Sequence, residues 1–218
     1  MKSITKKLAT KRSIAIAATR PSFGRRVFDE LLPMIIVSII VMAARSSLAD
    51  HYIIPSGSME HTLAPGDHVV VDKLSYGVRI PFTGIELAPG DVPRRGEVVI
   101  FDSPVDGERL IKRIVAEGGD HVSLIAGELR IDGRSMRDVS GDDIERYGDR
   151  VARLNLRHGG GRDIAPMVVP VGHLLVVGDA RGNSRDGRYF GLIPVDLPYG
   201  KAKGVIYRRG EGLVWKTL

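Results

Sequence analysis

The chain has 218 residues, enough for one or two domains with a substantial buried core. Its 26 glycines and 12 prolines favour a turn-rich, strand-rich body over a helical bundle. The absence of cysteine excludes disulfides, thiolate metal sites and cysteine nucleophiles. The net charge of +6 comes from residues 1–27, which carry eight Lys or Arg and no acid, whereas residues 51–218 hold 23 basic and 23 acidic residues. We therefore expect no nucleic-acid partner and relate the basic tail to membrane topology.

An uncharged apolar run of fourteen residues, 31–44, follows the basic tail. A helix needs about 20 residues to span a bilayer. The run extends to Ala49 if Arg45 snorkels its guanidinium to the interface. We predict a cytoplasmic tail over residues 1–27 and a transmembrane helix over residues 28–49. The positive-inside rule then places the N-terminus in the cytoplasm and the body on the outer side.

A removed signal peptide is the alternative for this segment, because Ser47-Leu48-Ala49 has the small-x-small form of a cleavage site. The basic tail is long for the start of a signal peptide, and Arg45 interrupts the approach to the cut. We therefore expect an uncleaved anchor, and clipping near Ala49 stays an open alternative.

Short apolar or alternating runs between turn signals fill the rest of the chain. They predict strands at 68–74, 97–103, 109–116, 121–126, 128–134, 173–179 and 203–209. Residues 135–165 are charged and interrupted by glycines, so we predict an inserted subdomain or loop there. The β domain then comprises residues 50–134 and 166–218. The predicted fold class is mainly β, with an N-terminal transmembrane helix followed by an antiparallel sheet.

Residues 55–59, Pro-Ser-Gly-Ser-Met, follow the predicted membrane exit. The isolated motif is typical of an ordinary loop, because serine and glycine are common in turns. The glycine also allows a sharp turn that exposes Ser58, whose hydroxyl needs a base within hydrogen-bond reach to act as a nucleophile. The six histidines show no metal-binding spacing, although a triad of Ser58 with His61 or His68 and an aspartate stays open.

Lys112 is the stronger candidate for the base. It lies in an apolar strand segment, residues 110–115, and burial among aliphatic side chains lowers the pKa of a lysine until a neutral amine is available. A lysine on the solvated face of the strand is the ordinary alternative. Arg113 is its neighbour, so the two side chains face opposite ways, and the pattern does not decide which one faces inward.

A polar cluster occupies residues 178–188. Taken alone it is a polar loop with an Asp–Arg ion pair, which contributes little if exposed. Taken as part of a site, Ser184 can hydrogen-bond the amine of Lys112, and Asp186 and Arg188 can fix the loop.

These motifs, in this order, resemble the bacterial type I signal peptidases (leader peptidases), a family of serine–lysine peptidases. The resemblance rests on PSGSM (55–59) with Thr62-Leu63, Gly66-Asp67 to Lys73 with Tyr76-Gly77, Arg95-Gly96-Glu97-Val98-Val99, Lys112-Arg113 with Gly119-Asp120, and Gly178-Asp179 with Asn183-Ser184, Asp186 and Arg188. One such motif is weak evidence, but five in the family's order behind an apolar segment form a strong signal.

The resemblance implies a role for each matching residue. Ser58 is the nucleophile and Lys112 the general base, while the Ser58 N–H and the Ser56 hydroxyl form the oxyanion hole. Ser184 positions Lys112, and structural support comes from Asp179, Asp186 and Arg188. Pockets for small side chains, one and three positions before the cut, are lined in the family by residues matching Tyr52, Ile54, Pro55, Met59, Leu63, Ile100 and Ile111.

Two departures from the family are visible. Gly187 stands where many relatives have serine, and the 135–165 insertion lacks the cysteine pair of some relatives.

The implied activity is removal of signal peptides from exported precursors by cutting after Ala-x-Ala, without metal or cofactor. The implied place is the outer face of the bacterial cytoplasmic membrane. The expected partners are signal-peptide-bearing precursors, the lipid bilayer and the protein-export machinery. Two alternatives stay open: a specialised Ser/Lys peptidase for pilus or conjugation subunits, and a non-catalytic membrane-tethered β domain.

Overall fold

The computed structural model describes residues 30–38, 49–79, 86–138 and 143–218. The chain divides into two units, residues 1–41 and 42–218. In the first unit, residues 30–38 form a helix with exposed side chains. Within the described ranges, no helix has both the length and the apolar character needed to cross a bilayer. The predicted tail and much of the predicted span, residues 28–49, lie outside the described residues, so both stay predictions.

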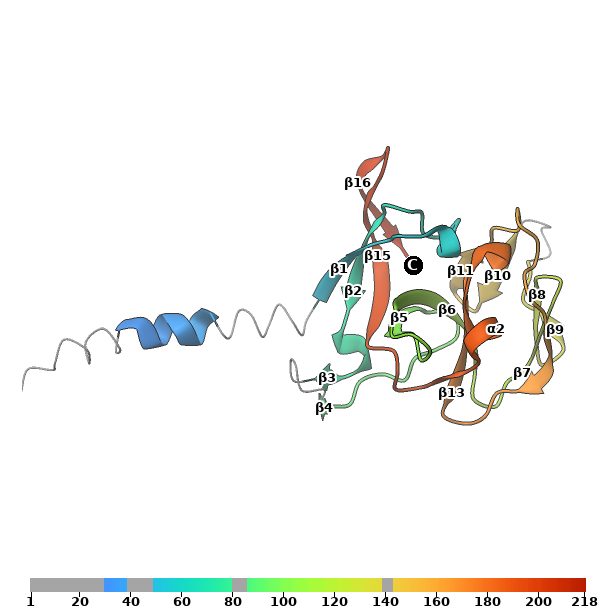
Figure 1. Cartoon of the computed structure of the whole chain (residues 1–218), viewed down its shortest axis with the longest axis horizontal. Helices are drawn as coiled ribbons and strands as arrows, with labels where there is room; N and C mark the ends of the chain where they lie inside the picture. The colour runs from blue at the N-terminus through green and yellow to red at the C-terminus, as the bar shows by residue number, and fades with distance from the viewer. Residues whose placement is uncertain (1–29, 39–48, 80–85, 139–142) are drawn as a thin grey trace, which may run out of the picture. The chain divides into compact units, whose positions relative to one another are not determined.

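The second unit consists mainly of antiparallel strands (Figure 1). One sheet has eight strands, in the order β1 (Ala49–Ile53), β2 (His68–Asp72), β15 (Gly200–Arg208), β5 (Val98–Asp102), β6 (Arg109–Glu117), β13 (His173–Val177) and β14 (Ile193–Pro194), with β16 (Gly212–Thr217) paired to β15. A four-stranded sheet has the order β12 (Ile164–Val168), β7 (His121–Ile125), β8 (Glu128–Ile131) and β9 (Arg134–Ser135).

The smaller elements include the pair β10 (Ile144–Tyr147) and β11 (Arg150–Arg153), the pair β3 (Val78–Arg79) and β4 (Glu86–Ala88), and the short helix α2 (Gly187–Phe190). Figure 1 shows the four-stranded sheet, called the small sheet below, and the β10–β11 pair at one side of the body, and β1, β2 and β15 at the other.

All seven predicted strands are confirmed, as β2, β5, β6, β7, β8, β13 and β15. The mainly β, antiparallel class of the body is confirmed with them. The sequence did not predict β10 and β11, because each has four residues of which two are charged, and neither forms a longer apolar run. It also missed β1, whose first residue had been assigned to the membrane helix.

Strand β5 crosses the centre of the large sheet and is buried on both faces, which explains its continuous apolar sequence. Val98 and Ile100 join one core cluster with residues of β2 and β15. Val99 and Phe101 join a second cluster with residues of β13. Strand β6 pairs along the full length of β5, so its Lys112 and Arg113 are drawn into the same interior.

A third core cluster joins the small sheet to the ends of β6 and β13, where Leu124 and Leu129 pack with Val115 and Leu175. The β10–β11 pair contributes to the same cluster, so much of the predicted insertion, residues 135–165, is folded against the body. The four-stranded sheet also contains β7 and β8, which precede residue 135, so it extends beyond the predicted insertion.

Candidate active site

Ser58 lies in a single 3₁₀ turn, Gly57–Met59, between β1 and β2. Met59 is fully buried in the core below the turn, while Ser58 is 7% exposed. The Ser58 carbonyl accepts a hydrogen bond from the Ala180 N–H at 3.1 Å, which ties the turn to the loop that follows β13. The serine is therefore held from two sides.

Lys112 reaches Ser58 from β6. Its Nζ donates a hydrogen bond to Ser58 Oγ at 2.7 Å, and its side chain is only 2% exposed. Burial lowers the pKa of the Lys112 ammonium to about 8, although the carboxylates of Asp186 and Asp179 act in the opposite direction. No ion pair with Lys112 is found in the described part of the chain. A lysine in this state supplies a neutral amine at mildly alkaline pH, within reach of a hydroxyl.

Arg113 faces the opposite way along β6 and is equally buried, at 1% exposed. Its Nε and Nη2 donate to the two carboxylate oxygens of Asp179 at 2.9 and 2.8 Å. Its Nη1 donates to the Gly96 carbonyl at 2.7 Å. The choice that the sequence left open therefore has an unexpected outcome: both side chains face inward, one toward Ser58 and the other toward a carboxylate.

A second buried ion pair fixes the loop between β13 and α2. Arg188 Nε and Nη2 each donate to a carboxylate oxygen of Asp186 at 2.8 Å. The Asp186 carboxylate also accepts hydrogen bonds from the Gly178 N–H at 2.9 Å and from the Arg188 N–H at 3.2 Å. Arg188 also donates to the Gly160 carbonyl at 2.9 Å, so residues of the predicted insertion help to hold this loop.

Ser184 lies in the same loop, and its Oγ is buried with no hydrogen-bond partner among the described residues. The hydrogen bond to Lys112 that the resemblance implies is thus not formed in this structure, and the base-orienting role stays a prediction. The hydroxyl lies against Gly178, where a Cβ atom would be 2.2 Å from Ser184 Oγ and 2.5 Å from the Ser58 carbonyl oxygen. A glycine is required there for the two segments to approach.

Ser56, the other residue of the predicted oxyanion hole, directly precedes the 3₁₀ turn. Its Oγ donates to Ser58 Oγ at 3.4 Å. Ser56, Ser58 and Lys112 therefore form one connected group of polar atoms.

Neither histidine of the alternative triad contacts Ser58 among the interactions of the described residues. His61 is exposed. The His68 ring instead lies 6.0 Å from the His51 ring and 5.1 Å from the Tyr207 ring, centroid to centroid. The basic group beside the serine is Lys112. No cluster of metal-ligating side chains occurs in the described ranges either.

An apolar pocket of about 140 Å³ has among its lining residues the sequence neighbours of Ser56 and Lys112, namely Pro55 and Ile111. It is lined by Tyr52, Ile53, Ile54, Pro55, Ile100, Arg109, Leu110 and Ile111, which include five of the seven residues predicted for the substrate pockets. The remaining two, Met59 and Leu63, are fully buried in the core cluster that also contains Ile54 and Ile100. These two residues support the pocket from below and do not line its open space.

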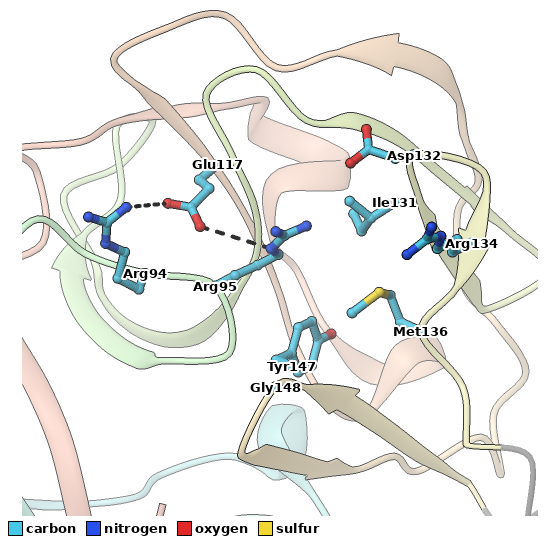
Figure 2. Close-up of a pocket in the computed structure, with 9 residues that line it drawn as sticks. All are labelled: Arg94, Arg95, Glu117, Ile131, Asp132, Arg134, Met136, Tyr147 and Gly148. Carbon is cyan, nitrogen blue, oxygen red and sulfur yellow. Dashed lines mark hydrogen bonds and ion pairs between the residues drawn. The ribbon is translucent and has the colours of Figure 1, made fainter.

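A larger hollow of about 620 Å³ lies elsewhere on the body, between the start of β5, the end of β6 and the strands β8 to β10 (Figure 2). Arg95 and Arg134 point toward each other across it. Glu117 pairs with Arg94 at 3.5 Å and with Arg95 at 3.9 Å. Neither Ser58 nor Lys112 lines this hollow, and, unlike the apolar pocket with its Ile111, the hollow has no lining residue next to either of them in the sequence.

Sequence reasoning missed three residues near the site. Arg113 was treated as the outward neighbour of Lys112 or its rival, whereas it anchors Asp179 in the core. Arg109 lines the apolar pocket, and its guanidinium lies against the rings of Tyr52 and Tyr199. Arg109 stands directly opposite Asp102 in the β5–β6 register, and opposite charges at such positions stabilise a strand pair. This pairing could have identified Arg109 only if the register were known, and one sequence does not give the register.

Comparison with known proteins matches residues 28–207 to a family described as signal peptidase, peptidase S26. Signal peptidase I of Pseudomonas fluorescens is 32% identical to this chain over 194 residues, covering 78% of this chain and 68% of the relative. Signal peptidase I of Pseudomonas aeruginosa is 33% identical over 178 residues, covering 74% of this chain and 63% of the relative.

A solved signal peptidase I from Enterococcus faecalis is 25% identical, with coverage of 51% of this chain and 97% of that one. Its TM-score of 0.39 is too low to support an argument about the fold. The family match, in contrast, covers most of this chain and defines it as a peptidase. The chain belongs to the signal peptidase family, peptidase S26. The resemblance inferred from its motifs is thereby confirmed.

Proposed function

We propose that this peptidase removes signal peptides from exported precursors, with Ser58 as the nucleophile and Lys112 as the general base. The observation that carries the proposal is the 2.7 Å hydrogen bond between Lys112 Nζ and Ser58 Oγ. It occurs where burial brings the pKa of the amine down to about 8, so a usable fraction of the base is neutral near physiological pH.

The proton movements follow from this pair. The neutral amine of Lys112 accepts the hydroxyl proton as Ser58 Oγ attacks the carbonyl carbon of the scissile bond. The resulting ammonium gives that proton to the leaving amine, which releases the mature protein and leaves an acyl group on Ser58. A water molecule then loses a proton to Lys112 and attacks the acyl carbon, and the proton returns to Ser58 when the ester breaks.

The negative oxygen of each tetrahedral intermediate needs donors that are already in place. The Ser58 N–H and the Ser56 hydroxyl fill this role in the proposal. The hydroxyl of Ser56 already lies 3.4 Å from Ser58 Oγ. The Asp179–Arg113 and Asp186–Arg188 ion pairs hold the segments around the dyad, and a rotation of Ser184 toward Lys112 would orient the amine.

The apolar lining of the pocket supports cleavage after apolar residues such as alanine. Ile100 and Ile111, which bound its space of about 140 Å³, offer aliphatic contacts to an alanine side chain. Ile111 is the neighbour of Lys112, and Pro55 lies three residues before Ser58, so a side chain in this pocket is close to the reacting bond. A precursor with Ala-x-Ala before the cut fits this arrangement.

The bilayer is the proposed second partner, with the N-terminus in the cytoplasm and the body on the outer side of the bacterial cytoplasmic membrane. The basic tail and the apolar run of residues 31–44 support this topology. On the body, Leu213 and Trp215 lie two positions apart on β16, and their side chains are 89% and 62% exposed. Such residues suit a membrane interface and support a position close to the lipid and the export machinery.

The proposal is tested by incubating the full chain in detergent with a precursor whose signal ends in Ala-x-Ala. The wild type should cut after the second alanine, and Ser58→Ala, Lys112→Ala and Lys112→Arg should be inactive but folded. Lys112→Arg keeps the charge, and a guanidinium cannot accept the proton. Lys216→Ala, which removes an exposed lysine on β16, is the matched control and should retain activity.

The same assay separates the alternatives. Cleavage of a pilin or conjugation subunit without cleavage of ordinary precursors would indicate a specialised peptidase. A membrane-tethered binding domain would retain its function in Ser58→Ala and Lys112→Ala, which would contradict the dyad.

A further inference from the structure

Arg109 is the one charged side chain among the residues that line the apolar pocket beside the dyad. It stands opposite Asp102 across the β5–β6 pair, and its Nε donates to Asp102 Oδ1 at 3.0 Å. The mechanism described above gives it no role in proton transfer. Its position at the pocket's edge raises the question of what it does there.

The Arg109 guanidinium is held against two tyrosines. Its Cζ lies 4.8 Å from the centre of the Tyr199 ring and 5.6 Å from the centre of the Tyr52 ring, distances typical of cation–π contacts. Arg109 Nη1 also donates to the Tyr52 hydroxyl. The two tyrosine hydroxyls are 3.0 Å apart, so the three side chains form a closed set of contacts.

These contacts come from separate parts of the chain, which is why they can immobilise the arginine. Tyr52 belongs to β1, Asp102 to β5, and Tyr199 precedes β15, where its N–H donates to the Ile100 carbonyl at 3.0 Å. A free arginine side chain has many rotamers and yields to a substrate. One fixed by an ion pair, a hydrogen bond and two rings does not yield without losing them together.

We propose that Arg109, fixed by Tyr52 and Tyr199, is a rigid outer wall of the pocket and determines its preference for small precursor side chains. The proposal rests on the proposed signal-peptide cleavage and adds a specificity-determining residue to it. Ile54, Ile100 and Ile111 bound the pocket from within the core, where they are packed against other residues. Arg109, whose side chain is 50% exposed, lies on the solvent side of the pocket, and in this proposal it limits how far a larger side chain extends there.

The test compares Arg109→Ala with the wild type on matched precursor peptides that carry alanine or leucine at one position before the cut. Position −1 and position −3 are varied separately. The readout is the ratio of kcat/KM for leucine over alanine, which cancels any general loss of activity in the variant. We expect Arg109→Ala to raise this ratio by about tenfold or more at one of the two positions, because each methylene that a pocket accepts or rejects changes kcat/KM by about tenfold or more.

Two further proteins make the result specific. Arg109→Lys keeps the charge and the aliphatic stem but loses the planar fork, so its ratio should lie between those of the wild type and Arg109→Ala. Arg130→Ala removes another exposed, ion-paired arginine, on β8, and should leave the ratio unchanged. If the wild type cuts Ala-x-Ala and the ratio stays constant in Arg109→Ala, the wall is refuted while the proposed function stands.

A binding measurement covers the case in which the wild type cuts no precursor, which would refute the proposed function. The same alanine and leucine peptides are titrated into Ser58→Ala, with and without Arg109→Ala, while the methyl resonances of Ile100 and Ile111 are followed by NMR. Leucine-peptide binding that is gained only in the double variant supports the wall. Equal discrimination with and without Arg109 overturns it.

Discussion

Two neighbouring residues of β6 show how one strand can carry both a reactive group and a rigid support. Lys112 and Arg113 are cations, and both are almost completely buried. Arg113 has a carboxylate in bidentate contact, that of Asp179, and its charge is thereby compensated. Within the described ranges, Lys112 forms a hydrogen bond with the Ser58 hydroxyl and no ion pair, and burial lowers its pKa to about 8.

The difference teaches that burial alone does not determine what a cation does. A buried charge with a carboxylate in good geometry stays charged and connects the segments around it. A buried lysine without one releases its proton more readily and becomes a base. The predictions below change one side of this comparison at a time.

Lys112→Met should have the largest effect on catalysis. It removes the proposed base while keeping a side chain of similar length, so we expect cleavage to fall by a factor of about 10³ or more. Stability should not fall with it, because an apolar side chain suits this buried position. Parallel measurements of kcat/KM and urea unfolding check both expectations; a variant that is inactive because it is unfolded would contradict the second.

The sign of the stability change follows from the pKa. The folded state holds the Lys112 pKa at about 8 against an ordinary 10.5, so a protonated lysine there costs stability below pH 8. The cost disappears as the pH rises from about 8 to 10.5. Lys112→Met should therefore be more stable than the wild type near pH 7 by about 1–4 kcal/mol, with a gain that shrinks toward pH 10.

Asp179→Ala tests Arg113, the second residue of the comparison. It leaves the Arg113 guanidinium buried without its carboxylate, so the free energy of unfolding should fall by about 3–5 kcal/mol. The exposed pair Arg130–Glu128 offers the control, since Glu128→Ala should change the free energy of unfolding by about 0–1 kcal/mol. Urea or thermal unfolding measures both, and equal losses in the two variants would refute the structural role given to Asp179.

The wild-type pH profile tests the proposed role of Lys112 through a smaller expected change in kcat/KM. Because the neutral amine is the active form, kcat/KM should increase about tenfold per pH unit below pH 8 and level off above it. A peptide substrate without titratable side chains isolates the enzyme's own ionisation. A profile that is flat from pH 6 to 9 would mean that Lys112 is not the base.

Glu108→Gln should give the smallest effect. The exposed Glu108 carboxylate raises the pKa of Lys112, so its removal should move the pH profile slightly toward lower pH. Glu211→Gln, which removes a carboxylate at the β15–β16 turn, is the control and should not move it. A shift toward higher pH in Glu108→Gln would contradict the electrostatic account.

The sequence predicted most of the long strands and singled out Ser58 and Lys112, which are hydrogen-bonded in the structure, because apolar periodicity and short motifs are local properties. It also predicted five of the residues that line the apolar pocket. It did not predict that Arg113 would be buried, since nothing local says that Asp179 lies across the sheet from it. The Arg109–Tyr52–Tyr199 contacts were missed for the same reason, as they join residues up to 147 positions apart.

Direct titration of Lys112 tests the central claim most simply. The full chain is labelled at lysine side chains, and the Lys112 resonance is assigned by its absence in Lys112→Met. Its chemical shift is then followed by NMR from pH 6 to pH 11. A midpoint near 8 is the predicted result and would establish a buried amine that is neutral at working pH. A midpoint near 10.5, the ordinary value for lysine, would contradict the account of Lys112 as the base.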